Sequence, residues 1–299
     1  MKEWAGRVHF SEVASNAVDF FAIGAMTPGE VIQARQRRHK IGNTEGDGEP
    51  NMKVHCYDTA EELGMAAAKQ AAARMQAVAA QQQWIPVVFA TGASQLATLR
   101  GLTAIPDLPW ERVIGFHMDE YLGISAEHPA SFRHYLRKEL VERVPLREFH
   151  EIDGNASDAD QFCAYYTDLL RRFPAQLCLL GIGENGHLAF NDPAEADFGD
   201  SRDMKIVTLD RECRQQQVNE EWFGSLEEVP KQALTLTIPA LMRIPELIAS
   251  VPGRRKCGAV ERTLGEEIST HCPATILRTH VNAHVYLDRD SAAGVEFSC

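Results

Sequence analysis

Three short segments of the sequence carry polar residues of the types that perform acid–base chemistry. One reads GIGENGHLAFNDP over residues 181–193 and holds His187 between Asn185 and Asp192. An imidazole exchanges protons near neutral pH, and a neighbouring amide or carboxylate can orient it. Packing alone gives a buried strand little reason to end in such a glycine-rich, polar run. This segment therefore predicts a functional site.

The second segment, MDEYLG at residues 118–123, places the adjacent carboxylates Asp119 and Glu120 directly after an apolar run. A carboxylate in that position can act as a general base, particularly where burial raises its pKa. The structural alternative is that Asp119 caps a turn and Glu120 is solvated. Without further context, the second segment favours this alternative.

The third segment is Thr91-Gly92-Ala93-Ser94, between an apolar run and a helical pattern. Such a turn exposes backbone N–H groups at the start of a helix, with a hydroxyl on either side, and this suits a phosphate or another anion. The alternative is a plain turn in which Ser94 caps the helix. The residues of this segment leave the two interpretations about equally supported.

These segments must be positioned by the elements around them. Apolar runs of strand length alternate with helical patterns, which predicts a parallel or mostly parallel α/β sheet. Ligands of such sheets bind beyond the carboxyl ends of the strands, so the loops after Ala90, Phe116 and Ile182 are expected to meet there. The expected strands are 53–56, 85–90, 113–116, 177–182, 206–209, 233–238, 247–251 and 284–287, and the expected helices are 58–82, 94–102, 131–144, 157–172 and 254–264.

The bulk properties exclude some classes of function. The 299 residues carry a net charge of −12, which argues against nucleic acid as the main partner. Seven scattered cysteines without a CxxC pair indicate free thiols, and neither a signal peptide nor a membrane-length apolar segment is present, so we expect a cytoplasmic protein. Residues 1–50 are expected to be an extension and linker, and residues 51–299 a single catalytic domain.

Taken together, the segments resemble the glucosamine-6-phosphate deaminase/isomerase family from about residue 52 to residue 290. The most specific motifs are MDEYLG, GIGENGHLAFNDP and VPKQALT at 229–235, with weaker support from TGAS at 91–94, Ser131 and GRRK at 253–256. The resemblance implies a modified doubly wound (Rossmann-like) α/β fold. It also implies a reaction that opens an amino-sugar phosphate ring, shifts a proton between C2 and C1 and expels ammonia, without a metal or redox cofactor.

The resemblance implies a role for each matching residue. Asp119 matches the base that moves the proton, and His187 matches the histidine that promotes ring opening. Asn185 and Asp192 match the two acidic residues that orient this histidine. The phosphate-binding positions are Thr91, Gly92, Ala93, Ser94 and Lys256.

Three departures from the family pattern affect these roles. Asn185 stands where some members have Asp, and Asp192 is one methylene shorter than the usual Glu. The family's arginine shortly before the VPK motif is missing, because Asn219, Glu220 or Glu221 aligns with it. The candidates to replace it are Arg214, Arg254 and Arg255.

Two other functions stay open at this point. One is a 6-phosphogluconolactonase-like hydrolase, although that group typically has DER in place of MDEY and Thr-Ala-Ser after the histidine. The other is a non-catalytic sugar-phosphate sensor, although residues 1–50 show no convincing helix-turn-helix. We expect no allosteric site of the kind that regulated family members form at a subunit interface, and a homo-oligomer stays open.

Overall fold

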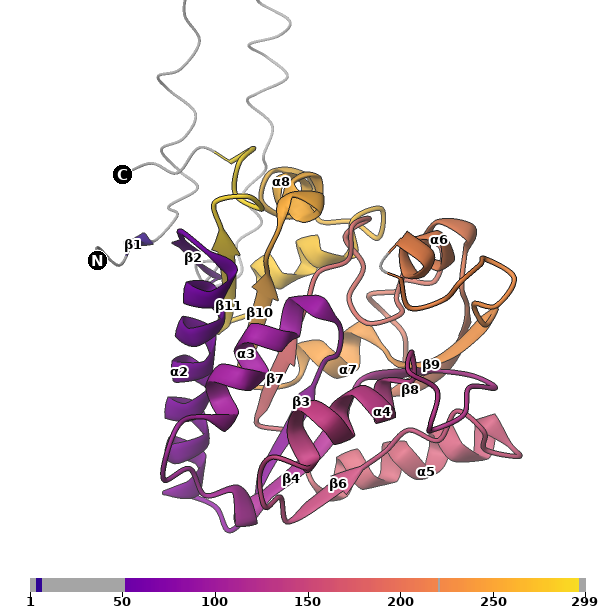
Figure 1. Ribbon diagram of the computed structural model, residues 1–299, viewed down its shortest axis with the longest axis horizontal. Coiled ribbons are helices and arrows are strands. Elements are labelled where there is room, and N and C mark those ends of the chain that lie inside the picture. The colour runs from indigo at the N-terminus through magenta and orange to yellow at the C-terminus, as the bar shows by residue number, and fades with distance from the viewer. Residues whose placement is uncertain (1–3, 7–51, 220, 296–299) are drawn as a thin grey trace, which may run out of the picture.

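A computed structural model describes residues 4–6, 52–219 and 221–295, so most of the expected extension and linker lies outside the described residues. The described part contains a central sheet in the strand order β1-β2-β11-β10-β7-β3-β4-β6 (Figure 1). Every neighbouring pair is parallel except β1 and β2. The strands are β1 Trp4–Gly6, β2 Lys53–Tyr57, β11 Ala283–Asp288, β10 Leu247–Val251, β7 Leu177–Leu180, β3 Ile85–Phe89, β4 Val113–His117 and β6 Glu148–His150.

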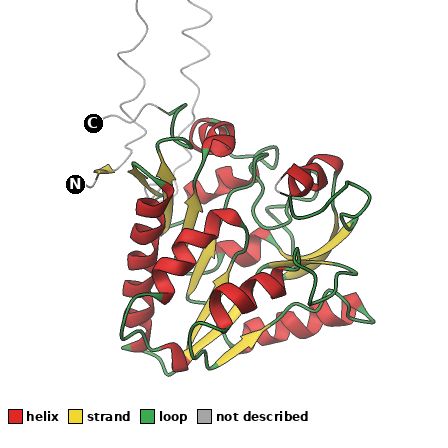
Figure 2. Cartoon of the chain, in the orientation of Figure 1, coloured by secondary structure: helices red, strands yellow, loops and turns green. Residues whose placement is uncertain are grey.

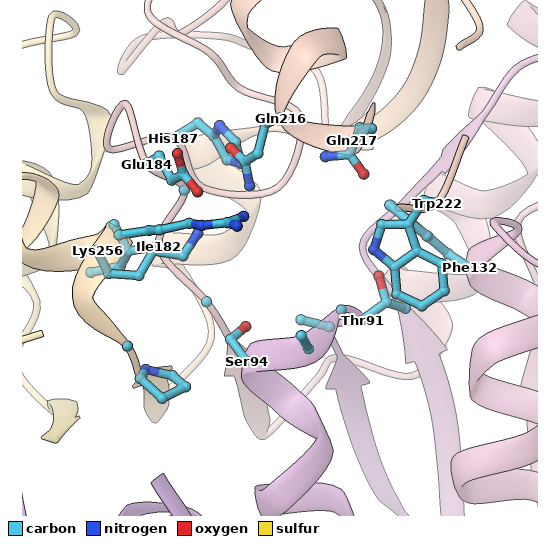
Figure 3. A pocket seen from close by; sticks show the side chains of 18 of the residues that line it. Thr91, Ser94, Phe132, Ile182, Glu184, His187, Gln216, Gln217, Trp222 and Lys256 are labelled. Atoms are coloured by element: carbon cyan, nitrogen blue, oxygen red, sulfur yellow. The ribbon is translucent and has the colours of Figure 1, made fainter. Parts of the chain in front are cut away.

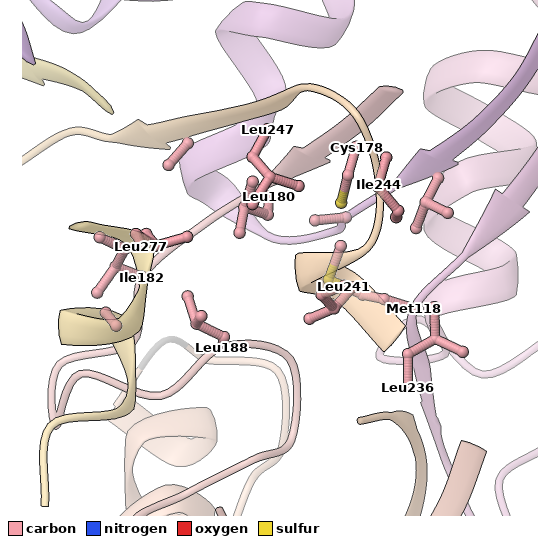
Figure 4. Packing of buried hydrophobic residues seen from close by; sticks show 14 of the residues in the cluster. Met118, Cys178, Leu180, Ile182, Leu188, Leu236, Leu241, Ile244, Leu247 and Leu277 are labelled. Carbon is pink, nitrogen blue, oxygen red and sulfur yellow. The ribbon is translucent and has the colours of Figure 1, made fainter. Parts of the chain in front are cut away.

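Helices cover both faces of this sheet (Figure 2), which confirms the mostly parallel α/β architecture. The alternation of side chains along each strand divides the core in two. The longer helices are α2 Ala60–Ala79, α3 Ala93–Thr103, α5 Ala159–Arg172, α6 Arg211–Asn219 and α8 Cys257–Gly265, and the short ones are α4 Phe132–Leu136 and α7 Ile238–Met242. In β7, Leu177 and Leu179 pack with α2 and α3, whereas Cys178 and Leu180 pack with α5, α7 and α8 (Figure 4).

Local sequence signals explain the start of α2. Thr59 is its N-cap and accepts a hydrogen bond from the Glu62 N–H at 3.2 Å, while the Glu62 carboxylate accepts one from the Asp58 N–H at 3.2 Å. The first bond satisfies one of the backbone donors that a helix start otherwise leaves without a partner, and the second ties the residue before the N-cap to the first turn. The alanine-rich sequence that follows has high helix propensity, so the helix expected from residue 58 or 59 forms.

A second, antiparallel sheet lies beside the first, in the order β5-β9-β8, with bounds β5 Asp119–Tyr121, β9 Gln232–Leu236 and β8 Met204–Thr208. The expected strands 206–209 and 233–238 correspond to β8 and β9, except that β9 ends at Leu236 and Ile238 begins α7. These two strands pair with each other and not in the parallel sheet. Local periodicity cannot distinguish these partners, since both sheets bury apolar strands. Only Met118 separates β4 from β5, so Asp119 stands where the chain passes from one sheet to the other.

Among the described residues, no helix combines the length and the apolar character that crossing a membrane requires.

Candidate active site

A cavity of about 650 Å³ lies at the carboxyl ends of the central strands, next to the small antiparallel sheet. Asp119 and His187 both line it, although 68 positions separate them in the sequence. Figure 3 shows Thr91 and Ser94 on one side of the opening, His187 on the opposite side and Lys256 at one end. The structure therefore brings the residues of all three polar segments to one concave site.

Asp119 begins β5 and is 7% exposed. Burial raises the pKa of its carboxyl group well above the usual value, and the adjacent charge of Glu120 raises it further. A carboxyl group with a raised pKa holds and releases a proton closer to neutral pH than an ordinary aspartate does. The position and environment of Asp119 therefore suit a general base.

Glu120 is not solvated, contrary to the structural alternative that the sequence favoured: it is 0% exposed. Its carboxylate accepts hydrogen bonds from the Ser131 hydroxyl at 2.8 Å and from the backbone N–H groups of Phe132 and Arg133 at 3.1 and 3.0 Å. The Arg133 guanidinium lies 3.5 Å away. Glu120 thus ties the start of α4 to β5 and fixes the strand that carries Asp119.

Asp192 forms an ion pair with His187: Nδ1 of the imidazole lies 2.8 Å from Oδ1 of the carboxylate. With Nδ1 occupied there, Nε2 is the nitrogen available to a ligand in the cavity. Burial alone would raise the pKa of Asp192, but the charge of His187 and hydrogen bonds lower it to about 2. The shorter Asp192 side chain therefore still reaches the imidazole.

The Asn185 side chain contacts Asp192 and the backbone of His187, not the imidazole ring. Its amide nitrogen donates to Asp192 Oδ1 at 2.7 Å, and its oxygen accepts from the backbone N–H of His187 at 3.0 Å. The hydrogen bond that Asn185 accepts from His187 thus comes from the backbone and not from the ring. An amide can make both contacts, whereas a carboxylate here would accept only.

Gly183 sets how closely the backbone approaches this histidine. A Cβ atom added at residue 183 would lie 2.3 Å from Cε1 and Nε2 of His187, so the ring must shift to admit it. We expect Gly183→Ala to lower the turnover rate of a reaction that uses this imidazole by about a hundredfold, because moving a reacting group by about 1 Å costs about that much. Gly265→Ala is the matched control, since a Cβ there meets nothing within 4 Å. Equal turnover rates for the two variants would show that the position of the His187 ring does not depend on Gly183.

The Thr91–Ser94 turn follows β3 and opens α3. Gly92 is the N-cap, with φ of +94°, and no side chain caps the helix, so the alternative in which Ser94 is the cap is wrong. The Tyr135 hydroxyl donates to the Gly92 carbonyl at 3.0 Å and holds the turn. The Thr91 and Ser94 side chains both line the cavity, together with Gly92 and Ala93.

Arg254, Arg255 and Lys256 form the short 3-10 turn η3 after β10, and all three line the cavity. The Asp288 carboxylate accepts hydrogen bonds from the Gly253 N–H at 3.0 and 2.9 Å and so anchors this turn. The turn thus brings three cationic side chains to a cavity that Glu184, Asp288 and Asp290 also line, and an anion can pair with these cations.

Arg214 does not line the cavity, in contrast to Arg254 and Arg255. Its guanidinium donates to the carbonyls of Leu226 and Val229. Of the other expected positions, Asn219 and Glu221 do not line the cavity either, and Glu220 lies outside the described residues. Nothing in the sequence excludes Arg214 as a phosphate-binding residue, because the distance from Arg214 to the cavity depends on how α6 is rotated.

Several lining residues were not anticipated from the sequence. They come from the loop before His187, from the start of α4 and from α6 and the loop after it: Glu184, Phe132, Gln216, Gln217 and Trp222 (Figure 3). Glu184 lies within the GIGENGH motif, so its proximity to His187 could have been inferred. The side chains of α6 carry no such signal.

A parallel α/β sheet whose strand ends enclose a buried carboxyl group, an ion-paired imidazole and a cationic turn is suited to acid–base chemistry on a small anionic substrate. The chain belongs to the family described as glucosamine-6-phosphate isomerases/6-phosphogluconolactonase, whose model matches residues 58–286. The resemblance inferred from the motifs is thereby confirmed.

Two bacterial glucosamine-6-phosphate deaminases are similar to this chain in sequence. The chain is 35% identical to a glucosamine-6-phosphate deaminase of Exiguobacterium sp. over 186 residues, which is 62% of this chain and 71% of the relative. It is 30% identical to that of Lactobacillus delbrueckii subsp. bulgaricus over 242 residues, 81% and 99% of the two chains.

Solved structures agree with the fold. A monomeric glucosamine-6-phosphate deaminase superposes with a TM-score of 0.73 at 29% identity, covering 81% of this chain and 99% of that one. A 6-phosphogluconolactonase from Thermotoga maritima superposes with a TM-score of 0.65 at 17% identity, covering 79% and 99%, which supports the fold alone.

Proposed function

We propose that the protein is an aldose–ketose isomerase and deaminase that converts glucosamine 6-phosphate, or a related amino-sugar phosphate, to fructose 6-phosphate and ammonia. The observation that carries this function is that the buried Asp119 carboxyl group and the His187 imidazole face one cavity with a cationic turn. The deaminase relatives, at 35% and 30% identity, support the same reaction.

The two side chains divide the proton transfers between them. Nε2 of His187 takes and returns the proton that must move between the ring oxygen and the C1 hydroxyl when the sugar ring opens, and Asp192 stabilises the imidazolium formed on the way. Asp119 then removes the C2 proton of the open chain and returns it to C1. Water adds at C2 and ammonia leaves, so that the ketose phosphate remains.

The phosphate is assigned to the turn Thr91–Ser94 and to the cations Arg254, Arg255 and Lys256. Backbone N–H groups, hydroxyls and positive side chains all suit this anion. Because the phosphate is remote from the reacting carbons, its binding energy serves to orient the sugar. The candidate Arg214 has no part in this assignment.

Lys256→Met tests the phosphate assignment. We expect the KM for glucosamine 6-phosphate to rise about 10- to 100-fold, since a charged hydrogen bond is lost, while kcat changes by less than about threefold. Lys138→Met is the matched control, because Lys138 is an exposed lysine paired only with Glu142. A lower kcat at an unchanged KM would show that Lys256 does not bind the substrate in its ground state.

The experiment that tests the function measures ammonia and fructose 6-phosphate released from glucosamine 6-phosphate by the purified protein. Hydrolysis of 6-phosphogluconolactone, measured in parallel, tests the lactonase alternative. Deamination without lactone hydrolysis is the expected result. Lactone hydrolysis above background without ammonia release would replace the proposed reaction, and ligand-induced thermal stabilisation without turnover would favour a sensor.

We also propose that the protein works in the cytoplasm. Six cysteines lie in the described part of the chain, and all of them are free thiols. Free thiols persist in a reducing compartment, which is where an enzyme of sugar-phosphate metabolism meets its substrate.

A further inference from the structure

The helix α6 presents a buried amide to the cavity. Gln217 is 7% exposed and lines the site. Its Oε1 accepts a hydrogen bond from the Tyr121 hydroxyl at 2.8 Å, so the side chain is held in one orientation. In Figure 3 the amide nitrogen of Gln217 faces the side of the cavity that holds His187. With the oxygen occupied, Gln217 meets a ligand as a hydrogen-bond donor.

Tyr121 links this amide to the strand that carries Asp119. Both residues belong to β5, where Asp119 pairs with Thr235 and Tyr121 with Ala233. Residues two apart on a strand lie on the same face, about 7 Å from each other. Gln217 is therefore anchored to the strand that carries the base and lines the same cavity, whereas Lys256 lies at a different end of the opening (Figure 3).

We propose that Gln217 is a specificity-determining residue whose Nε2 donates a hydrogen bond to an uncharged oxygen of the sugar, a hydroxyl or carbonyl near the carbons between which Asp119 moves the proton. Tyr121 positions this donor. The inference rests on the proposed function. A neutral amide binds a phosphate much more weakly than a guanidinium does. We therefore assign Gln217 of α6 to the sugar, and η3 and the Thr91–Ser94 turn to the phosphate.

Two conservative variants test the donor and its support. Gln217→Met keeps the length of the side chain and removes the amide, and Tyr121→Phe keeps the buried ring and removes only the hydroxyl. We expect each to lower kcat/KM for glucosamine 6-phosphate about tenfold or more, while the protein still unfolds in one cooperative transition. Gln215→Met is the control, because Gln215 is exposed on the same helix and its amide bonds Asn219.

Isothermal titration with inorganic phosphate distinguishes sugar recognition from anion binding. The affinity for phosphate should stay within about twofold of wild type in Gln217→Met and should not increase in Gln217→Arg. The proposal is overturned if Gln217→Met loses phosphate affinity, if Gln217→Arg gains it, or if Gln217→Met leaves kcat/KM unchanged. An effect of Gln217→Met without one of Tyr121→Phe overturns the positioning by Tyr121.

The same titrations separate this inference from the proposed function. If the wild-type protein released no ammonia, the reaction would be wrong. Binding of glucosamine 6-phosphate could still be compared between wild type and Gln217→Met. Weaker binding of the sugar phosphate, with unchanged binding of inorganic phosphate, would then support the role of Gln217 without any turnover.

Discussion

Asp119→Asn is expected to lower kcat for ammonia release by about 100- to 10,000-fold, which is the usual contribution of a positioned general base. The amide is nearly the same shape as the carboxyl group but cannot take the C2 proton. Asp168→Asn removes an exposed carboxyl group from α5 and serves as the control. An Asp119→Asn variant with wild-type kcat would remove Asp119 from the mechanism.

The same variant should lose no stability at neutral pH, which separates a catalytic loss from a structural one. Because the pKa of Asp119 is raised in the folded state, the folded state binds this proton more tightly than the unfolded state does. Ionisation of Asp119 therefore destabilises the fold as pH rises above the ordinary carboxyl range, and Asp119→Asn removes that cost.

The unfolding temperature measures this effect. The difference between Asp119→Asn and wild type should grow in favour of the variant between about pH 5 and about pH 8. A variant that unfolds at a lower temperature than wild type at the higher pH would mean that the ionised carboxylate is stabilised by its surroundings, contrary to the direction assigned to its pKa.

The second large effect is expected from His187→Asn, which should lower kcat by about 100- to 10,000-fold, because it removes the group that carries the proton during ring opening. The variant should still bind an open-chain amino alditol phosphate with an affinity within about threefold of wild type, since this ligand has no ring to open. Isothermal titration measures that affinity directly.

His271→Asn is the control for this substitution, because His271 is exposed and does not line the cavity. If His187→Asn weakened binding of the open-chain ligand as much as it lowered kcat, His187 would be a binding residue and not the proton carrier. Asp192→Asn should show a smaller loss than His187→Asn, since it leaves the imidazole in place and removes only the charge behind it.

Much of the fold follows from local sequence. The runs at 85–90, 113–116 and 247–251 are apolar on both faces, which only a strand covered by helices on two sides can bury. The carboxyl ends of parallel strands meet at one edge, so the polar segments that follow them were expected to converge. The roles of Asp119 and His187 stay predictions, implied by the family motifs in which they lie.

The tertiary structure decided which groups these residues contact. It assigned Glu120 to the start of α4 instead of to solvent, gave the oxygen of Asn185 to the backbone of His187, and turned Arg214 away from the cavity. It also brought Gln217 to the Tyr121 hydroxyl, across 96 positions of sequence. Periodicity and motifs report which face of an element is buried, but not which distant element covers it. The hydrogen-bond partners and pKa shifts of the site therefore follow only once the chain is folded.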